Sequence, residues 1–372
     1  MSNAANKPKR AILHIGTEKT GTTSLQECLA LSRKSLRSHG VLYPQSAGPK
    51  NHTRLVASSL DDGVVDNIKA HFMAARGEDE TKLRTSFAED LAHEMGEGPD
   101  WHTLLLSSEL IHSRLHTQTE IDRLFSYFSA YVDEIHVVLV LRQQDKLAVS
   151  RFSTVIRAGH RGTDDIFDDL HEHAYVSVPV NRYISDFEHY YDYARLIERF
   201  AGYVPAEKFH IWLYEDGGIK LDAVARFEAM LDVKLTPGSK GVVLNNAMSL
   251  TAQYIIARLN AEFPTRLASG RRNETFVALK NQIAVEVTGP PRKVNEADAK
   301  AFMERFTHSN AAVASRLHRR QLFEPAAGNQ LHVGRNVLPP DFDALLEHYR
   351  KLLQKKMRST LYSHIKSFLK PR

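Results

Sequence analysis

Four short apolar runs mark the first two thirds of the chain, and each is followed by a polar turn. They cover residues 10–15, Thr103–Ser107, Ile135–Leu141 and Phe209–Tyr214. Because each run is continuous rather than alternating, it indicates a strand buried on both faces, as in a parallel sheet. Helical spacing of apolar residues lies between and after them, at residues 22–38, 64–76, 81–95, 119–131, 145–158, 181–200 and 219–231.

Strands that alternate with long helices predict an α/β fold, with three layers and a central parallel sheet between helices. In such sheets ligands bind beyond the carboxyl ends of the strands. We therefore expect the segments that follow the four strands to surround one crevice. These segments are residues 16–24, 107–112, 142–150 and 214–216.

The strand pattern stops near residue 240. Helical patterns continue at residues 249–263, 273–286, 297–320 and 340–369, separated by turns rich in glycine and proline. The pattern predicts an α/β core over residues 10–240. It predicts a helical C-terminal extension over residues 241–372, packed as a cap on the same core.

Composition narrows the class of protein only slightly. The 372 residues carry 49 basic and 44 acidic side chains, a net charge of +5 that gives weak support for an anionic ligand. No nucleic-acid-binding module is recognisable, so we expect no nucleic-acid partner. The single cysteine, Cys28, fits a reducing compartment, and no apolar run approaches the ~20 residues of a membrane span. We expect a cytoplasmic protein; peripheral membrane contact and oligomeric state stay open.

The turn after the first strand carries the first candidate chemistry. Its sequence places Gly16, Lys19 and Gly21 just before a helix that begins with Thr22 and Thr23. Glycines let backbone N–H groups face an anion, and the helix N-terminus adds its unpaired donors and positive dipole. Simple capping of a strand-to-helix turn is the alternative. The coincidence of five such positions favours a phosphate-binding loop.

The lysine of this loop is displaced from the position that a nucleoside triphosphatase uses. A Walker-type loop has Lys directly after the second glycine, where it reaches the outer phosphates, and Ser or Thr next to hold Mg²⁺. Here Thr22 follows Gly21, and the lysine is Lys19, on the rim. This arrangement favours a nucleoside 5′-phosphate that carries a group to be transferred, without a metal.

A second anion site is expected after the third apolar run. Arg142 ends that run, and Ser150 falls about one and a half turns into the next helix. An arginine fork and a hydroxyl that converge there would hold a second phosphate. The alternative is a surface arginine and an ordinary helical serine.

The two stretches together resemble the sulfotransferases that use 3′-phosphoadenosine 5′-phosphosulfate (PAPS). Lys19–Thr23 matches the family's K-[ST]-G-T-[ST] loop, and Arg142, Ala148 and Ser150 match its R-x-P-x-x-x-A-x-S signature, with Gln144 in place of proline. Tyr214 begins a Y-E-D stretch similar to the family's. Ser24 stands where small-molecule members have a tryptophan that stacks on adenine, which favours the bacterial and carbohydrate-type branches.

The resemblance implies a role for each matched residue. Lys19 would neutralise the oxygen that bridges phosphate and sulfate, and Arg142 and Ser150 would hold the 3′-phosphate. Tyr214 would touch the adenine. The product would be adenosine 3′,5′-bisphosphate (PAP), with no metal, and the acceptor a hydroxyl of a sugar or glycolipid. Thr20, Gly21, Thr22 and Thr23 would hold the 5′-phosphate in a core of the P-loop type, and Gly16 and Ser24 are further candidates for binding the donor.

An acceptor hydroxyl needs a general base. Glu109, just past the second strand, is the best candidate, and His112 is three residues on, at helical spacing for the same face. Glu18 is a weaker candidate. The alternative for Glu109 is a structural role at a helix start. Two other functions stay open for the whole chain: a small-molecule kinase using ATP, and a non-catalytic nucleotide-binding protein.

Overall fold

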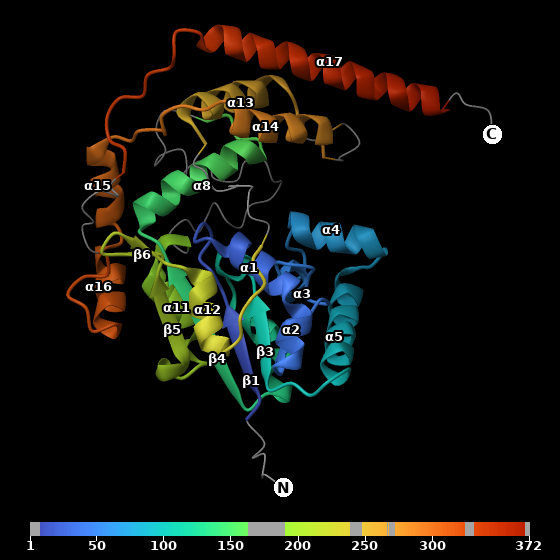
Figure 1. The fold of residues 1–372 in the computed structure, drawn as a ribbon, viewed down its shortest axis with the longest axis vertical. Coiled ribbons are helices and arrows are strands. Elements are labelled where there is room, and N and C mark those ends of the chain that lie inside the picture. Colours follow the sequence, from blue (N-terminus) through green and yellow to red (C-terminus); the bar gives the residue numbers. More distant parts are fainter. Residues whose placement is uncertain are drawn as a thin grey trace. The chain divides into compact units, whose positions relative to one another are not determined.

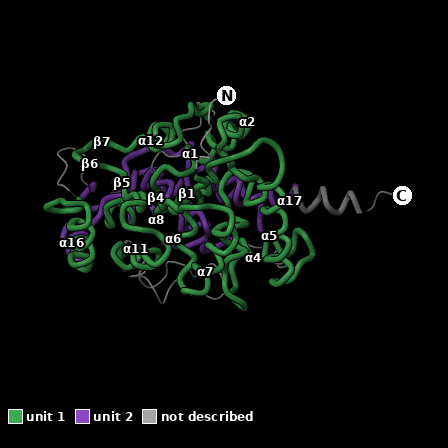
Figure 2. Tube along the Cα trace, turned by 90° about the horizontal axis from the view of Figure 1, so that it is seen from below, with its two compact units in different colours: residues 1–147, 178–245, 304–330 green, residues 148–177, 246–303, 331–372 purple. Residues whose placement is uncertain are grey.

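The computed structural model describes residues 8–162, 190–238, 248–265, 267, 272–323 and 331–368, with residues 360–368 described by their backbone alone. By contact the chain groups into two compact units (Figure 2). The first comprises residues 1–147, 178–245 and 304–330, and the second residues 148–177, 246–303 and 331–372. The division expected from sequence, at residue 240, stays a prediction.

A five-stranded parallel sheet forms the centre of the first unit (Figure 1). Its strand order is β2-β3-β1-β4-β5, so the N-terminal strand is central, with Ile12 beside Leu105 on one neighbour and His136 on the other. A two-stranded antiparallel ribbon, β6-β7, follows the last strand. The strands are β1 (Arg10–His14), β2 (Val41–Leu42), β3 (Thr103–Ser107), β4 (Glu134–Leu141), β5 (Phe209–Leu213), β6 (Glu215–Asp216) and β7 (Ile219–Lys220).

Helices occupy most of the remaining described chain. Those up to the sheet's third strand are α1 (Thr22–Leu31), α2 (Arg33–Ser38), α3 (Thr53–Ser59), α4 (Asn67–Arg76) and α5 (Glu80–Gly96). Next come α6 (Leu110–Arg114), α7 (Gln118–Ser126), the 3-10 helix η1 (Ser129–Tyr131), α8 (Gln144–Ala158), α11 (Tyr193–Ala201), the 3-10 helix η2 (Ala206–Lys208) and α12 (Ala223–Leu231). The C-terminal helices are α13 (Leu250–Glu262), α14 (Glu274–Glu286), α15 (Glu296–Glu304), α16 (Thr307–Arg316) and α17 (Phe342–Phe368).

The first unit has three layers, which confirms the predicted α/β class. In Figure 2 the helices α1, α2 and α12 lie on one side of β1, β4 and β5, and α6, α7 and α11 lie on the other. One core cluster joins Ile12 and Leu105 of the sheet to Leu25 of α1 and Phe227 of α12. The opposite sheet face, which carries Leu13, is also buried. Coverage of both faces explains the continuous apolar runs.

Several predicted elements differ from those observed. The helix expected at 22–38 is two helices, because Ser32 leaves helical geometry and its hydroxyl accepts a hydrogen bond from the Thr236 amide at 2.7 Å. The helix expected at 297–320 is likewise divided into α15 and α16. The short elements β2, α3 and α6 were not predicted. Residues 181–189 of the helix expected at 181–200 lie outside the described residues.

The helix predicted from residue 219 begins only at Ala223. Asp222 caps it, accepting a hydrogen bond from the Ala225 amide at 3.0 Å. Residues before this cap form a β-hairpin whose two turn residues, Gly217 and Gly218, have φ of 56° and 83°. Positive φ at both positions is the geometry of a type I′ turn, which a Gly-Gly pair adopts without strain. The Gly-Gly pair was therefore a hairpin signal that the helical spacing obscured.

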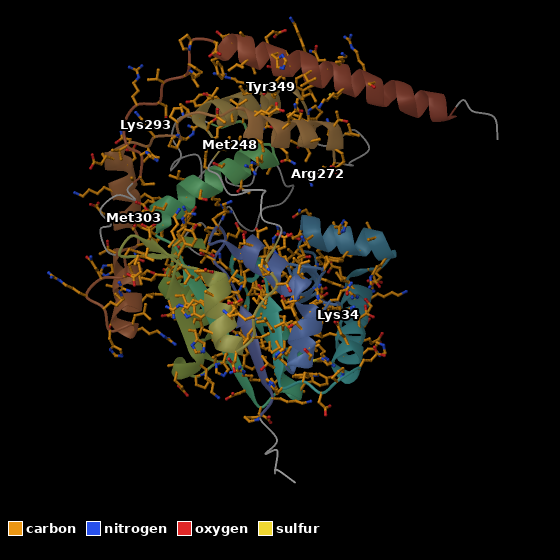
Figure 3. The ribbon with its side chains drawn as sticks, viewed as in Figure 1. Lys34, Met248, Arg272, Lys293, Met303 and Tyr349 are labelled. Atoms are coloured by element: carbon orange, nitrogen blue, oxygen red, sulfur yellow. The ribbon has the colours of Figure 1, made fainter. Side chains whose placement is uncertain are left out.

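The second unit is helical in its described part. Helices α13, α14 and α17 pack on one another. The Tyr349 hydroxyl on α17, labelled in Figure 3, donates to Glu286 Oε2 on α14 at 3.2 Å. The Arg350 guanidinium on the same helix donates to both carboxylate oxygens of Glu262, at 2.7 and 2.6 Å. The predicted helical C-terminal part is thus confirmed as helical, and its role as a cap stays a prediction.

None of the helices in the described ranges combines the length and the apolar character that a membrane span requires.

Candidate functional site

The loop after β1 is anchored to the end of β4. The Thr17 amide donates to the Val140 carbonyl at 2.7 Å, the Thr17 hydroxyl donates to the same oxygen at 3.0 Å, and the Val140 amide donates to the Gly16 carbonyl. Three loop residues have left-handed φ: Gly16 (95°), Lys19 (64°) and Gly21 (82°). The strand-end register therefore sets the position of the loop, and the positive φ at Gly16 and Gly21 explains why glycine stands there.

The loop leads directly into the N-terminus of α1. Gly21 is the N-cap residue, and among the described residues no side chain caps this helix end. Thr23 and Ser24 are exposed, and Thr22 is buried. The Thr20 hydroxyl donates to the Thr17 carbonyl at 2.7 Å, so its proton points into the loop. The backbone donors and dipole of this helix end, together with Thr23 and Ser24, are the groups that can meet an anion.

Arg142 contacts this loop directly. Its Nη1 donates to the Lys19 carbonyl at 2.8 Å, and its guanidinium carbon lies 4.9 Å from the centre of the Tyr214 ring. A β-carbon at Gly21 would lie 3.9 Å from the same ring. The structure thus brings the loop, the strand-end arginine and Tyr214 together, from three separate stretches of the sequence.

One polar atom of Arg142 is left without a partner. Its Nε is buried and finds no hydrogen-bond acceptor among the residues that the structure describes. Burial lowers the pKa of the guanidinium, with the nearby Tyr214 opposing that shift. A buried cation with an unsatisfied donor is a group that an anion would stabilise.

Tyr193 hydrogen-bonds to the backbone of this arginine, and sequence reasoning did not identify it. Its hydroxyl, at the start of α11, donates to the Arg142 carbonyl. Burial raises the pKa of the Tyr193 hydroxyl well above its ordinary value, so the hydroxyl remains a donor. Because the two residues are 51 positions apart, no local pattern could have connected them.

Glu109 lies against the opposite side of the loop. It precedes α6, immediately after the carboxyl end of β3, and a β-carbon at Gly16 would be 2.9 Å from both its Cα and its Cβ. The Gln26 amide donates to its Oε2 at 2.8 Å, and the Asn51 amide donates to its Oε1 at 2.9 Å. The pKa of Glu109 is raised, chiefly because the carboxylate loses hydration, while the hydrogen bond from Gln26 opposes the shift.

His112 and Glu18 are connected through Tyr190. His112 is fully buried and its Nε2 lies 2.9 Å from the Tyr190 carbonyl, which requires a proton on Nε2. The Tyr190 hydroxyl donates to Glu18 Oε2 at 2.9 Å. Glu18 in turn raises the pKa of Glu109 by charge repulsion. His112 therefore supports the residue that holds Glu18, and a catalytic role for it stays a prediction.

Ser150 lies on α8, in the second compact unit, whereas Arg142 belongs to the first. The expected pairing of these two residues on one phosphate therefore stays a prediction. Within the described ranges no three His, Cys, Asp or Glu side chains gather as they would around a metal ion.

No family model matches this chain, and no curated protein matches it at a significant level. Among solved structures, a sulfotransferase from Alicyclobacillus acidocaldarius is similar at 15% sequence identity and a TM-score of 0.39. The match covers 70% of this chain and 98% of that protein. A likeness this distant does not indicate a function.

Proposed function

We propose that this protein is a sulfotransferase that moves the sulfuryl group of PAPS to an acceptor hydroxyl. The observation that carries the proposal is the convergence at one loop. Arg142 donates to the Lys19 carbonyl from one side, and Glu109 contacts Gly16 on the other. An anion site, a rim lysine and a carboxylate of raised pKa are the groups that such a transfer requires.

The donor is held by the loop and by the residues beneath it. The 5′-phosphate lies at the N-terminus of α1, where Gly21 through Ser24 supply backbone and hydroxyl donors. The 3′-phosphate takes the Nε of Arg142, which has no acceptor among the described residues. The Tyr214 ring, beside Gly21 and Arg142, contacts the adenine. The donor PAPS has no β- or γ-phosphate, so the transfer needs no metal ion to bridge them.

The transfer is an in-line displacement at sulfur. The acceptor oxygen forms a bond to sulfur as the bond between sulfur and the bridging oxygen breaks, and PAP departs with that oxygen. Lys19 offsets the charge that develops on the bridging oxygen. The acceptor proton passes to Glu109, whose raised pKa makes it a stronger base than an ordinary carboxylate. The products are a sulfate ester and PAP.

The acceptor is a hydroxyl of a sugar or glycolipid. Its support is the polar character of the groups near the carboxylate: Asn51 donates to Glu109, and Tyr190 donates to Glu18. A polyol can add hydrogen bonds to such groups, which an apolar acceptor cannot.

A transfer assay tests the proposal. Purified protein is incubated with sulfur-labelled PAPS and a panel of sugars, glycolipids and phenols, without added metal. We expect labelled product from a carbohydrate acceptor and a loss of at least ~100-fold in Glu109→Gln. Glu97→Gln, at an exposed carboxylate after α5, serves as the matched control. Phosphate transfer from ATP with no sulfuryl transfer would overturn the proposal.

A further inference from the structure

Both oxygens of the Glu109 carboxylate accept hydrogen bonds from side-chain amides. Gln26 on α1 donates to Oε2, and Asn51, in the stretch before α3, donates to Oε1. A carboxylate cannot donate, so both side chains must turn their nitrogens toward it. Besides these two amides, the Glu109 backbone amide and the Thr22 hydroxyl also hydrogen-bond to the carboxylate.

The Asn51 side chain uses its amide nitrogen for the hydrogen bond to Glu109. Among the residues described, Glu109 is its one side-chain hydrogen-bond partner, and its own Oδ1 is buried without a donor. A buried, half-satisfied amide costs stability, which a purely structural asparagine would not explain.

The backbone holds Asn51 in place through the next residue. The His52 amide donates to the Ser107 carbonyl at 3.0 Å, and the Ser107 amide donates to His52 Nδ1 at 3.1 Å. Burial lowers the pKa of His52 to about 3, so this imidazole stays neutral and its Nδ1 remains an acceptor. The end of β3, which carries Glu109 two residues on, is thus tied to the segment that carries Asn51.

Gln26 is fixed from within the core. It is buried on α1, and its amide also lies 3.4 Å from the Ser107 hydroxyl, which in turn is 2.9 Å from His14 Nδ1. Helix α1, whose N-terminus would bind the donor phosphate, therefore also holds the Glu109 carboxylate through Gln26. This geometry couples the donor loop to the base.

We propose that Gln26 and Asn51 are positioning residues of the sulfuryl transfer, which fix the Glu109 carboxylate beside the loop and keep it ionised for proton abstraction. The inference rests on the proposed function. Hydrogen bonds to a carboxylate favour its charged form, and they oppose two influences that favour the neutral form. Those influences are burial and the neighbouring charge of Glu18.

The charged and titratable groups around the carboxylate come from three elements. Glu18 lies on the loop, and Tyr43 lies on the stretch after β2, with Arg33 of α2 stacked on its ring at 5.2 Å. Burial raises the pKa of the Tyr43 hydroxyl, so Tyr43 stays neutral at ordinary pH. With Tyr43 neutral, the donors that offset Glu18 are the two amides, the Glu109 backbone amide and the Thr22 hydroxyl.

The test uses the near-isosteric variants Gln26→Met and Asn51→Leu, which remove a donor without adding charge. The exposed Gln45→Met is the control. The pKa of Glu109 is read directly, by carbon-13 NMR of side-chain carboxyls in the PAP complex, with Glu109→Gln to assign the signal. The pH profile of transfer, the affinity for PAP and the thermal unfolding are measured beside it.

We expect each variant to raise the Glu109 pKa by about one to two units, since a hydrogen bond to a charged group contributes roughly that much. The acid limb of the transfer profile should move to higher pH by the same amount. Turnover should recover at high pH, and PAP affinity should stay within about 2-fold. An unchanged pKa in both variants would overturn the proposal, as would turnover lost equally at every pH.

One outcome separates this inference from the proposed function. If the wild-type protein transfers no sulfuryl group but the Glu109 pKa rises in the variants, the amides position the carboxylate for another reaction and the sulfotransferase proposal fails alone. If Gln26→Met does not fold, Asn51→Leu decides the question, because Asn51 is a partly exposed residue outside the helices.

Discussion

Gly16 and Glu109 approach each other so closely that only a glycine fits. A β-carbon at Gly16 would lie 2.9 Å from the backbone Cα of Glu109, a separation that side chains cannot relieve. Gly16 also has φ of 95°, which disfavours any other residue. The phosphate loop and the candidate base are therefore built as one unit, and a change in the loop must move the carboxylate.

Gly16→Ala should abolish most transfer. The added carbon has to displace Glu109 or the loop, so we expect turnover to fall at least ~100-fold, as a displacement of about 1 Å does in preorganised sites. Gly63→Ala is the control, because Gly63 also has positive φ (71°) but no atom within 4 Å of the added carbon. Equal losses in the two variants would show that backbone strain alone explains the effect. Steady-state kinetics and thermal unfolding make the comparison.

Lys19→Ala should reduce turnover more than it reduces donor affinity. The lysine acts on charge that develops as the bridging oxygen leaves, so its removal should cost roughly 10²–10³-fold in kcat. PAP affinity should change much less. Lys34→Ala, an exposed lysine on α2 labelled in Figure 3, should change neither. A variant that keeps its kcat but loses affinity would assign Lys19 to binding alone.

Arg142→Lys should weaken recognition of the 3′-phosphate. A lysine lacks both the Nε donor and the planar face that lies over Tyr214. We expect affinity for PAP to fall about 10- to 100-fold, while affinity for adenosine 5′-monophosphate changes little. The matched control is Arg226→Lys, at an arginine stacked on Trp212. A PAP-to-monophosphate ratio that is the same in variant and wild type would contradict the assignment, as calorimetry can show.

Stability should fall as the pH drops below about 6.5. Burial lowers the pKa of His14 to about 4 and that of His52 to about 3, so both are neutral in the folded protein. Because the unfolded chain binds these protons at the ordinary value of 6.5, the stability they contribute is present above that pH and is lost toward pH 4.

Each of these histidines should lower the free energy of unfolding by about 1.4 kcal/mol per pH unit across that window. Denaturant unfolding between pH 7 and 4.5 measures the slope. His14→Gln should flatten it by about one proton, and His39→Gln, at an exposed histidine after α2, should leave it unchanged. An identical slope in wild type and His14→Gln would contradict the prediction.

The sequence predicted those parts of the site that lie at strand ends. Lys19 and Arg142 each follow a continuous apolar run, and local spacing was enough to place them at the carboxyl end of a parallel sheet. The hydrogen bond between them joins residues 123 positions apart, and the parallel pairing of β1 with β4 produces it.

The groups that orient the site could not be predicted in this way. Asn51 contacts Glu109 across 58 positions, and Tyr190 contacts Glu18 across 172. Neither lies in a motif, and their positions depend on tertiary contacts rather than on local spacing. Short elements such as β2 could not be predicted either, because a strand of two residues shows no periodicity in its hydrophobic pattern.

The most direct measurement is a calorimetric titration of the purified protein with adenosine 3′,5′-bisphosphate, beside ATP with and without Mg²⁺. We predict micromolar binding of the bisphosphate without metal, weaker binding of ATP, and no gain from Mg²⁺. Tighter binding of Mg-ATP than of the bisphosphate would contradict this prediction and would identify the loop as the site of a kinase.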